Sequence, residues 1–273
     1  KEYGESTKAV CQVLGIELVD VPDWNCCGAS AGHSLNHDMA VQLSGRNLLL
    51  AQGAGMDIVV PCSACYHNLR QADEELKADA DKQQKLEQAA GIPWTGGVHA
   101  RHLLDVVWNE IGVDNIHKMV KKSLSGLKAV PYYGCLITRP SHKDDFDSVE
   151  QPQSMDRLLD ACGCEVMKWS YKTDCCGAGL SLPQSEIVVD LIKKLIEKAK
   201  QAGADCIITA CPMCQANLEM RQNGANMPVL YFTEVLGMAL GMKDVNGWLK
   251  KHLVSTDGLV DKLNCVEKKG CQQ

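Results

Sequence analysis

A pattern of four cysteines occurs twice in this chain with the same internal spacing. Two adjacent cysteines come first, followed by Gly-Ala, and a Cys-x-x-Cys motif begins 35 residues after the second of them. One offset of 149 residues relates the two copies, which are Cys26, Cys27, Cys62 and Cys65, and then Cys175, Cys176, Cys211 and Cys214. Self-similarity at a fixed offset predicts a chain that is built from two structural repeats.

The similarity of the two copies continues beyond the cysteines. Residues 102–112 match residues 231–241 at the shorter offset of 129, because the first copy carries an additional charged stretch at 67–91. We interpret that stretch as a solvated helix, with a docking arm as the alternative. We therefore place the first repeat at 1–125, the second repeat at 126–245 and a C-terminal tail at 246–273.

Both copies predict the same order of helices and strands. A helix leads into a short strand and the Cys-Cys-Gly loop, and an amphipathic helix then precedes a buried strand that ends at Cys-x-x-Cys. The leading helix, short strand and buried strand are expected at 6–14, 16–19 and 58–60, and at 154–161, 165–169 and 207–209. This alternation predicts an α/β fold with two pseudo-symmetric repeats. Each repeat is a small, mostly parallel sheet flanked by helices, with its cysteine site at the carboxyl ends of the strands.

The composition narrows the chemistry of the cysteines and the class of partner. Fifteen cysteines are an odd number, and adjacent pairs fit the disulfide framework of a small secreted domain poorly. No targeting segment is visible, so we expect a cytoplasmic protein whose reduced thiolates bind metal.

A formal charge of −6 without a basic tract argues against a nucleic-acid partner. No apolar run reaches the roughly 18 residues that cross a bilayer, so we expect no membrane span.

One further cysteine of the second copy is a candidate ligand. Cys135 follows the strand-like run 129–133 and lies 40 residues before Cys175. Its counterpart in the first copy would fall near or before residue 1, and Cys11 is a poor substitute because it lies inside the leading helix. We therefore expect a short strand and a ligand cysteine just upstream of Lys1.

Three kinds of site remain open for these cysteines. Zinc takes four ligands at tetrahedral angles, which suits adjacent cysteines badly and leaves a fifth thiolate unused. An iron–sulfur cluster has several metal atoms to bind, and soft thiolates are its usual ligands. We favour iron–sulfur, with zinc in at least one half, or a disulfide or redox-active Cys-x-x-Cys, as the alternatives. No ferredoxin-type run of cysteines is present, so electrons must come from a partner.

The cysteine pattern resembles the signature of the CCG-domain family. That signature has two copies of a single cysteine, a Cys-Cys-Gly pair and a Cys-x-x-Cys motif, in this order. The pattern is similar in particular to the B subunit of heterodisulfide reductase, from Lys1 to about Asp244. The resemblance implies a noncubane [4Fe-4S] cluster in each half. Its cofactor ligands would be Cys26, Cys27, Cys62 and Cys65 in one half, and Cys135, Cys175, Cys176, Cys211 and Cys214 in the other.

The resemblance also implies an oxidoreductase acting on a sulfur group. The expected role is the catalytic subunit of a heterodisulfide reductase-like complex, in which a disulfide held between two clusters is reduced to two thiols. The implied partners are an iron–sulfur C subunit with ferredoxin-type clusters, a flavin-containing A subunit, and a small-molecule or protein disulfide. Leu136 stands where methanogen members tend to have histidine, so a substrate other than coenzyme M–coenzyme B is at least as compatible.

Other functions remain as alternatives to disulfide reduction. One is a non-catalytic electron-relay or quinone-linked iron–sulfur subunit of a succinate-, glycolate- or lactate-type oxidoreductase, and another is a zinc-bearing scaffold. His33, His37 and His142 follow cysteine motifs and are candidate proton donors, although surface roles are the simpler interpretation.

Ordinary structural roles are predicted for several further residues. We expect His99 and His102 to make core hydrogen bonds, and Trp24 and Trp169 to pack over the clusters. Cys206 is predicted to be a small core residue, and Cys162 and Cys164 flank a helix end, with a redox role as the less favoured interpretation. Cys265 and Cys271 are predicted to be unligated.

Overall fold

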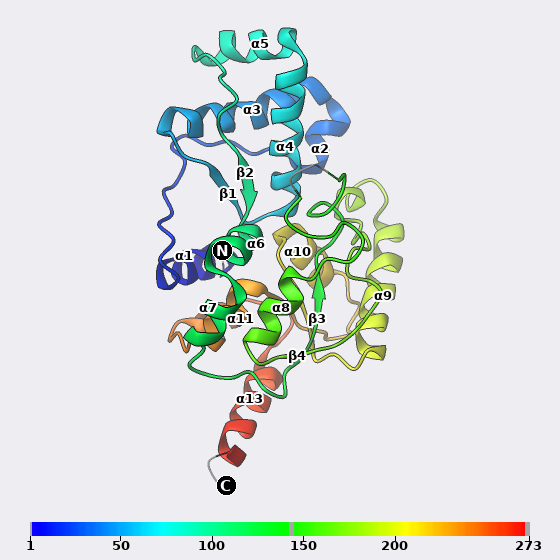
Figure 1. Cartoon of the computed structure of the whole chain (residues 1–273). Helices are drawn as coiled ribbons and strands as arrows, with labels where there is room; N and C mark the ends of the chain where they lie inside the picture. The colour runs from blue at the N-terminus through cyan, green and yellow to red at the C-terminus, as the bar shows by residue number, and fades with distance from the viewer. Residues whose placement is uncertain (1, 142–144, 271–273) are drawn as a thin grey trace. The chain divides into compact units, whose positions relative to one another are not determined.

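The buried strands predicted before each Cys-x-x-Cys motif are present in the computed structural model, as β1 (Ile58–Val60), which is labelled in Figure 1, and β5 (Cys206–Thr209). The structure describes residues 2–141 and 145–270, apart from the side chains of residues 30, 31 and 265–270. Two compact units contain these residues. The larger unit takes in described residues of Lys1–Leu18 and Val107–Gln273, and the smaller unit is Val19–Val106.

The larger unit is built on a four-stranded parallel sheet. Its strand order is β4-β3-β5-β6, where β3 is Lys128–Tyr132, β4 is Glu165–Val166 and β6 is Val229–Tyr231. Val130 lies opposite Ile207, and Ile208 lies opposite Leu230. All four residues of β5 are buried, as expected for a central parallel strand that is covered on both faces.

Helices cover this sheet because their apolar residues fall on one face. In α9, Val188, Ile192 and Leu195 recur at helical spacing and are buried, whereas Ile187 is exposed. Along the chain, the helices of the larger unit are α1 (Glu2–Val13), a π-helical turn (Val107–Ile111), α7 (Val113–Met119), α8 (Ser154–Ala161), a 3₁₀ turn (Ala178–Leu180), α9 (Ser185–Gln201), α10 (Pro212–Met220), α11 (Phe232–Ala239), α12 (Val245–Leu249) and α13 (Asp257–Gly270).

The leading helix α1 packs inside the larger unit, against α11 and α12. The ring of Tyr3 stacks on that of Tyr231 at a centroid distance of 4.0 Å, and the Tyr3 hydroxyl donates a hydrogen bond to the Ala210 carbonyl. The hydroxyls of Ser6 and Thr233 are 2.8 Å apart. A helix at the start of the first sequence copy is therefore packed among elements of the second. The two compact units are defined by packing, and their boundaries do not coincide with those of the two sequence repeats. The repeat boundaries at 125 and 245 therefore stay a prediction.

The smaller unit has a two-stranded parallel sheet, in which β1 pairs with β2 (Ala100–His102). Gly45 of α3 lets neighbouring helices pack closely, because a Cβ there would meet methyl groups of Leu76 and Leu86 at 2.8 and 2.9 Å. Figure 1 shows α3 and α4 crossing in this unit. Its helices are α2 (Ala29–Leu35), α3 (His37–Ala54), α4 (Ser63–Ala78), α5 (Ala80–Ala90) and α6 (Leu103–Val106).

The predicted α/β class with small parallel sheets flanked by helices is confirmed, and local details differ. Residues 16–19 form no strand, and the charged stretch is two helices rather than one. The break is at Asp79, whose carboxylate accepts hydrogen bonds from the backbone of Asp81 and Lys82 and so caps α5. The stretch is also partly buried, through Leu76 and Leu86. No helix in the described part of the chain is long and apolar enough to span a membrane.

Candidate metal centre

Five candidate ligands of the larger unit gather where two neighbouring strands end. Cys135 follows β3, and Cys211 follows β5 at the position that caps α10, so both leave the same edge of the parallel sheet. Cys214 lies in the first turn of α10, and its sulfur is 3.5 Å from that of Cys176. Cys175 is hydrogen-bonded to Cys135. The structure thus brings together all five cysteines that the sequence predicted for this half.

Two glycines allow the backbone to approach these sulfurs closely. Gly134 has a φ of +72°, and a Cβ there would lie 3.1 Å from the Cys214 sulfur. Gly177 has a φ of +75°, and its N–H donates to the Cys175 sulfur over 3.3 Å. A side chain at Gly134 would therefore both strain the backbone and crowd a thiol.

The loop that carries the adjacent cysteines is fixed to β3 and to α10. The Tyr132 hydroxyl donates to the Asp174 carbonyl at 2.6 Å, and the backbone N–H groups of Tyr133 and Gly134 donate to the Lys172 carbonyl. From α10, the side-chain amide of Asn217 donates to the Cys176 carbonyl at 2.6 Å. These contacts fix the adjacent pair Cys175 and Cys176 beside β3 and α10, which carry or precede the other three thiols.

The thiols of the larger unit share protons in pairs. A hydrogen bond from Cys135 lowers the pKa of Cys175 to about 6, with help from the Gly177 N–H and against the effect of burial. The hydrogen bond between Cys176 and Cys214 likewise lowers the pKa of Cys176, whereas the pKa values of Cys135 and Cys214 are raised by the hydrogen bonds that they share and by burial. One sulfur of each pair, that of Cys175 or Cys176, is therefore favoured as thiolate, the form that binds metal.

The smaller unit brings its four cysteines to the corresponding places. Cys62 caps α4 directly after β1, and Cys65 lies in the first turn of that helix. The sulfurs of Cys27 and Cys65 are 3.0 Å apart. This hydrogen bond raises the pKa of Cys27, and burial raises it further. Cys26, like Cys175, is exposed, whereas the second cysteine of each pair is buried.

Two asparagines that we did not predict support the adjacent cysteines in the same way. Asn68 donates to the Cys27 carbonyl at 3.2 Å, as Asn217 does to that of Cys176, and its amide also lies 3.6 Å from the Cys27 sulfur. The two asparagines are separated by the same offset of 149 residues as the cysteines. That offset was the signal in the sequence by which they could have been found.

The aromatic and histidine predictions have mixed outcomes. Trp24 is 69% exposed, so the prediction that it packs over a cluster is wrong. Trp169 is part-buried, and its indole N–H donates to the Pro131 carbonyl of β3. His102 makes the predicted core hydrogen bond, since its Nδ1 accepts from the Leu104 N–H at 3.0 Å, whereas His99 is exposed. His142 lies outside the described residues.

The remaining cysteines are structurally ordinary. Cys206 is fully buried at the start of β5, as predicted, and Cys162 and Cys164 are buried around the end of α8. The side chains of Cys265 and Cys271 lie outside the described residues. All thirteen cysteines with described side chains are free thiols.

The donor set fits a group that binds through sulfur. Every candidate ligand in both sites is a cysteine, and soft thiolates select iron–sulfur clusters and zinc over hard cations such as magnesium. In the described part of the chain, no three or more Cys, His, Asp or Glu side chains have the arrangement of a single-ion site.

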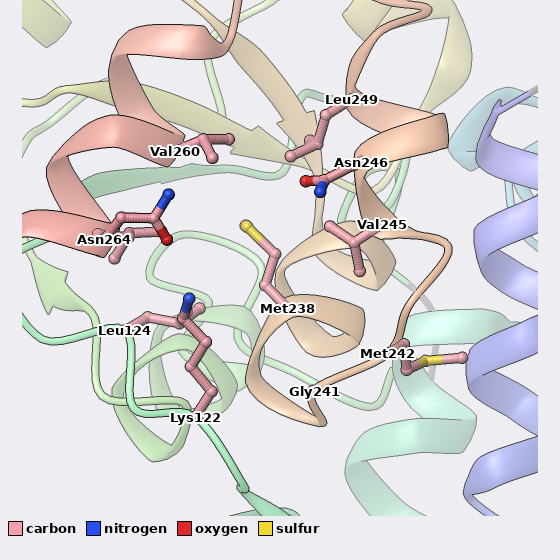
Figure 2. Close-up of a pocket in the computed structure, with 11 residues that line it drawn as sticks. Lys122, Leu124, Met238, Gly241, Met242, Val245, Asn246, Leu249, Val260 and Asn264 are labelled. Carbon is pink, nitrogen blue, oxygen red and sulfur yellow. The ribbon is translucent and has the colours of Figure 1, made fainter. Parts of the chain in front are cut away.

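A separate pocket of about 250 Å³ lies in the larger unit, away from the thiols. Figure 2 shows Met238, Val245, Leu249 and Val260 around it, between α11, α12 and α13. No cysteine lines this pocket, so it is not part of the candidate metal centre.

Comparisons with known proteins agree with this arrangement. The model of the CCG family, described as a cysteine-rich domain, matches residues 1–70 and 129–219. The 8-methylmenaquinol:fumarate reductase membrane anchor subunit of Wolinella succinogenes is 31% identical over 250 residues, which cover 88% of this chain and 87% of that protein. The B subunit of the ferredoxin/F420H2-dependent CoB-CoM heterodisulfide reductase of Methanosarcina acetivorans is 29% identical over 252 residues, covering 87% and 83%.

One solved structure shares the fold. It is the crystal structure of a hypothetical protein from Helicobacter pylori, with a TM-score of 0.73 and 15% sequence identity. The match covers 93% of this chain and 49% of that chain, so this chain spans about half the length of the solved protein.

Proposed function

We propose that this chain is the catalytic subunit of a heterodisulfide reductase-like complex. The chain belongs to the CCG family of cysteine-rich domains. Its reaction is the reduction of a disulfide to two thiols by two electrons and two protons. The chain itself has no ferredoxin-type run of cysteines, so its electrons come from a partner. The family resemblance implies that the partners are an iron–sulfur C subunit and a flavin-containing A subunit. The substrate is a small-molecule or protein disulfide.

The proposed cofactors are two noncubane [4Fe-4S] clusters, one in each unit. Their ligands are Cys26, Cys27, Cys62 and Cys65 in the smaller unit, and Cys135, Cys175, Cys176, Cys211 and Cys214 in the larger. When bound, each cluster supplies one-electron chemistry at sulfur.

The chain's own residues prepare the sites for that group. In the larger unit, Cys175 and Cys176 are poised as thiolates, Gly134 lets the backbone pass close to Cys214, and Asn217 fixes the carbonyl of the adjacent pair. Asn68 does the same for the pair of the smaller unit.

One observation carries the assignment to catalysis: the first cysteine of each adjacent pair is exposed while the second is buried. A site whose only task is to relay electrons can be enclosed, whereas a site that acts on a disulfide must let a substrate sulfur approach. The exposure of Cys26 and Cys175 supports such access from solvent at both sites.

A second candidate function is a non-catalytic electron relay that is linked to a quinone-dependent complex. It is favoured by the 31% identity to a membrane anchor subunit of a methylmenaquinol:fumarate reductase. In that case the thiol sites would pass electrons and would reduce no disulfide.

Activity separates the two functions. Anaerobically purified protein is given reduced methyl viologen as the electron donor and bis(2-hydroxyethyl) disulfide as the substrate, and released thiol is measured. We expect turnover in the wild type and its loss in Cys214→Ala, while Cys206→Ala, which changes a buried cysteine outside the site, stays active. Oxidation of viologen without thiol release, in a protein that contains iron, would support the relay function instead.

A further inference from the structure

Exposed apolar side chains lie beside the cysteine loop of the larger unit. Leu180 and Leu182 flank Ser181, whose hydroxyl donates a hydrogen bond to the side-chain oxygen of Asn217 at 3.0 Å. The amide nitrogen of the same asparagine donates to the Cys176 carbonyl at 2.6 Å. Both leucines are exposed, Leu182 to 93%. One asparagine therefore ties a segment with two exposed leucines to the adjacent cysteines.

Ile187 adds a third exposed apolar side chain, at the start of α9. The residue after it, Val188, packs against the cysteine loop, because a Cβ added at Gly177 would lie 3.2 Å from a methyl group of Val188. Gly177 directly follows Cys176. The loop and the helix thus both present apolar side chains close to the exposed Cys175.

The smaller unit presents the exposed Trp24 at its own cysteine loop. Both neighbours of the tryptophan are fixed to α3, since the Arg46 guanidinium donates to the Asp23 carbonyl at 2.6 Å and to Oδ1 of Asn25 at 2.9 Å. The side-chain amide of Asn25 in turn donates to the Cys26 carbonyl at 2.9 Å. The indole is therefore carried by a segment that hydrogen bonds hold on both sides, two residues before the exposed Cys26.

Met39 is a second exposed apolar side chain at this loop. It lies in the first turn of α3 and is 48% exposed. The next residue, Ala40, packs on the loop, because a Cβ added at Gly28 would lie 3.5 Å from the Cβ of Ala40. We call the exposed apolar residues of the two cysteine loops the apolar rim, which consists of Trp24 and Met39 in the smaller unit and of Leu180, Leu182 and Ile187 in the larger unit.

Several cations near the two cysteine loops are paired with carboxylates. These ion pairs are Arg46–Asp23, Lys172–Asp156, Lys194–Asp174 and Arg139–Glu150. A cation and a carboxylate in contact have opposing fields that largely cancel a few ångströms away. These pairs therefore offer little attraction to a negatively charged ligand.

The histidines that follow the cysteine loop of the smaller unit are engaged as well. His33 on α2 and His37 on α3 face each other through their Nδ1 atoms, which are 3.3 Å apart. The Nε2 atom of His37 lies 2.9 Å from the carboxylate of Glu75, which also pairs with Lys82 at 2.5 Å. This group thus has a carboxylate at its centre and is a poor anchor for an anion.

We propose that the apolar rim selects disulfides whose flanking groups are uncharged and apolar. The inference rests on the proposed function and names its substrate class. Contact with the rim removes apolar surface of such a substrate from water, and its sulfur atoms also pack well against an aromatic ring such as that of Trp24. A charged flank would lose hydration at the rim, where the cations named above are already paired. The substrate still takes up two electrons from the partner and two protons from solvent and leaves as two thiols.

A series of three disulfides tests the selection. Dipropyl disulfide and bis(2-hydroxyethyl) disulfide have the same number of heavy atoms and differ by methyl against hydroxyl, and bis(2-carboxyethyl) disulfide has two negative charges. With iron-loaded wild type and reduced methyl viologen, kcat/KM for dipropyl disulfide should exceed that for bis(2-carboxyethyl) disulfide about 10-fold, with the hydroxyethyl compound between them. Equal values for all three, or the reverse order, would overturn the selection.

Matched variants separate the rim from the intrinsic reactivity of each disulfide. Met39→Gln changes the rim of the smaller unit, and Met56→Gln is its control, because Met56 is 45% exposed and lies beyond the other end of α3. Leu182→Gln and the exposed Leu253→Gln form the same pair in the larger unit. Iron content and the paramagnetic resonance signal come first, to show that the sites are intact.

The rim variants should lose the preference for the apolar substrate. Their kcat/KM for dipropyl disulfide should fall about 5-fold, through a higher KM with unchanged kcat, because the lost contact is made equally in the ground state and the transition state. Their kcat/KM for bis(2-carboxyethyl) disulfide should stay at the wild-type value. Both controls should behave as wild type. Rim variants that keep the wild-type preference would overturn the proposal.

A second readout needs no turnover. In metal-free protein, the Cys175 thiolate attacks a disulfide, so that its sulfur joins one half of the reagent and the other half leaves as a thiolate. Mass spectrometry follows the mixed disulfide at Cys175. The ratio of the rates with dipropyl and bis(2-carboxyethyl) disulfide should be about 5-fold lower in Leu182→Gln than in wild type or Leu253→Gln. The same ratio in all three proteins would contradict a role for the rim.

The rim and the proposed function can fail separately. If the iron-loaded wild type reduces none of the three disulfides, the proposed function is wrong. A preference at Cys175 that depends on Leu182 would then still support the rim as the contact for an apolar ligand, and its absence would refute the rim too. Turnover without a preference would refute the rim alone, as expected of a surface that only docks a protein.

Discussion

Replacing His252 should remove a large, pH-dependent part of the stability of the larger unit. The imidazole is completely buried, with Nδ1 at 2.9 Å from Glu219 of α10 and Nε2 at 3.0 Å from Glu234 of α11. Both carboxylates are buried too and also accept backbone N–H groups, from Leu253 and Tyr231. The histidine therefore links the helix that carries Cys214 to its neighbour.

The size of the effect follows from the pKa of His252. Burial works against the charged ring, but the hydrogen bonds from it to Glu219 and Glu234 raise the pKa from 6.5 to about 10. At about 1.4 kcal/mol for each pH unit of that difference, the charged imidazole stabilises the fold by on the order of 5 kcal/mol. Because the folded-state pKa is raised, this stability is complete below pH 6.5 and is lost as the pH rises through about 10.

The assay is thermal unfolding of the anaerobic protein between pH 6 and pH 10, for the wild type, His252→Gln and the control His117→Gln. His117 is an exposed histidine of the same unit. At about 2 °C per kcal/mol for a chain of this size, the Tm of His252→Gln should lie about 10 °C below that of the wild type at pH 6. The gap should narrow toward pH 10. A gap that is the same at both pH values would refute the charged bridge.

Three further predictions concern the thiol sites. Gly134→Ala should destabilise the larger unit by about 1–2 kcal/mol and lower its iron content, because Gly134 has a positive φ and an added Cβ would contact the Cys214 sulfur. The control Gly247→Ala, where an added Cβ meets nothing within 4 Å, should retain its iron. Asn217→Ala should cost about 1–3 kcal/mol by leaving the Cys176 carbonyl unpaired, and Asn68→Ala should act on the other unit; thermal unfolding and iron analysis check both. In metal-free protein, alkylation of Cys175 followed by mass spectrometry should reach half its maximal rate near pH 6, and a midpoint near 8.5 would show an ordinary thiol.

The sequence predicted the cysteine sites better than it predicted the packing around them. The candidate ligands could be identified because the spacing of cysteines along the chain can be read directly from the sequence. Residues that follow neighbouring parallel strands also lie close together, at the carboxyl edge of the sheet. The partnership of Asn68 and Asn217 was visible in the same offset and was missed. Residues 16–19 are apolar enough for a strand, but strand formation needs a hydrogen-bonding neighbour, which no local pattern reveals.

Contacts between distant parts of the chain could not be predicted from the sequence. The stacking of Tyr3 on Tyr231 places the first helix among elements more than 200 residues away in the sequence. No repeat or hydrophobic periodicity predicts this contact. The same holds for His252, whose two carboxylate partners come from separate helices. The helix break at Asp79 was more accessible, because aspartate is a strong capping residue.

Metal analysis of ligand variants tests most directly the claim that the two cysteine sites hold iron–sulfur clusters. Anaerobically purified full-length wild type, with two complete ligand sets, should contain about eight irons and as many sulfides per chain, as two four-iron clusters require. Cys214→Ala should lose about half of both and keep the resonance signal of the smaller unit, while the matched variant Cys206→Ala keeps all of it. Stoichiometric zinc with little iron, or full iron in Cys214→Ala, would contradict the account.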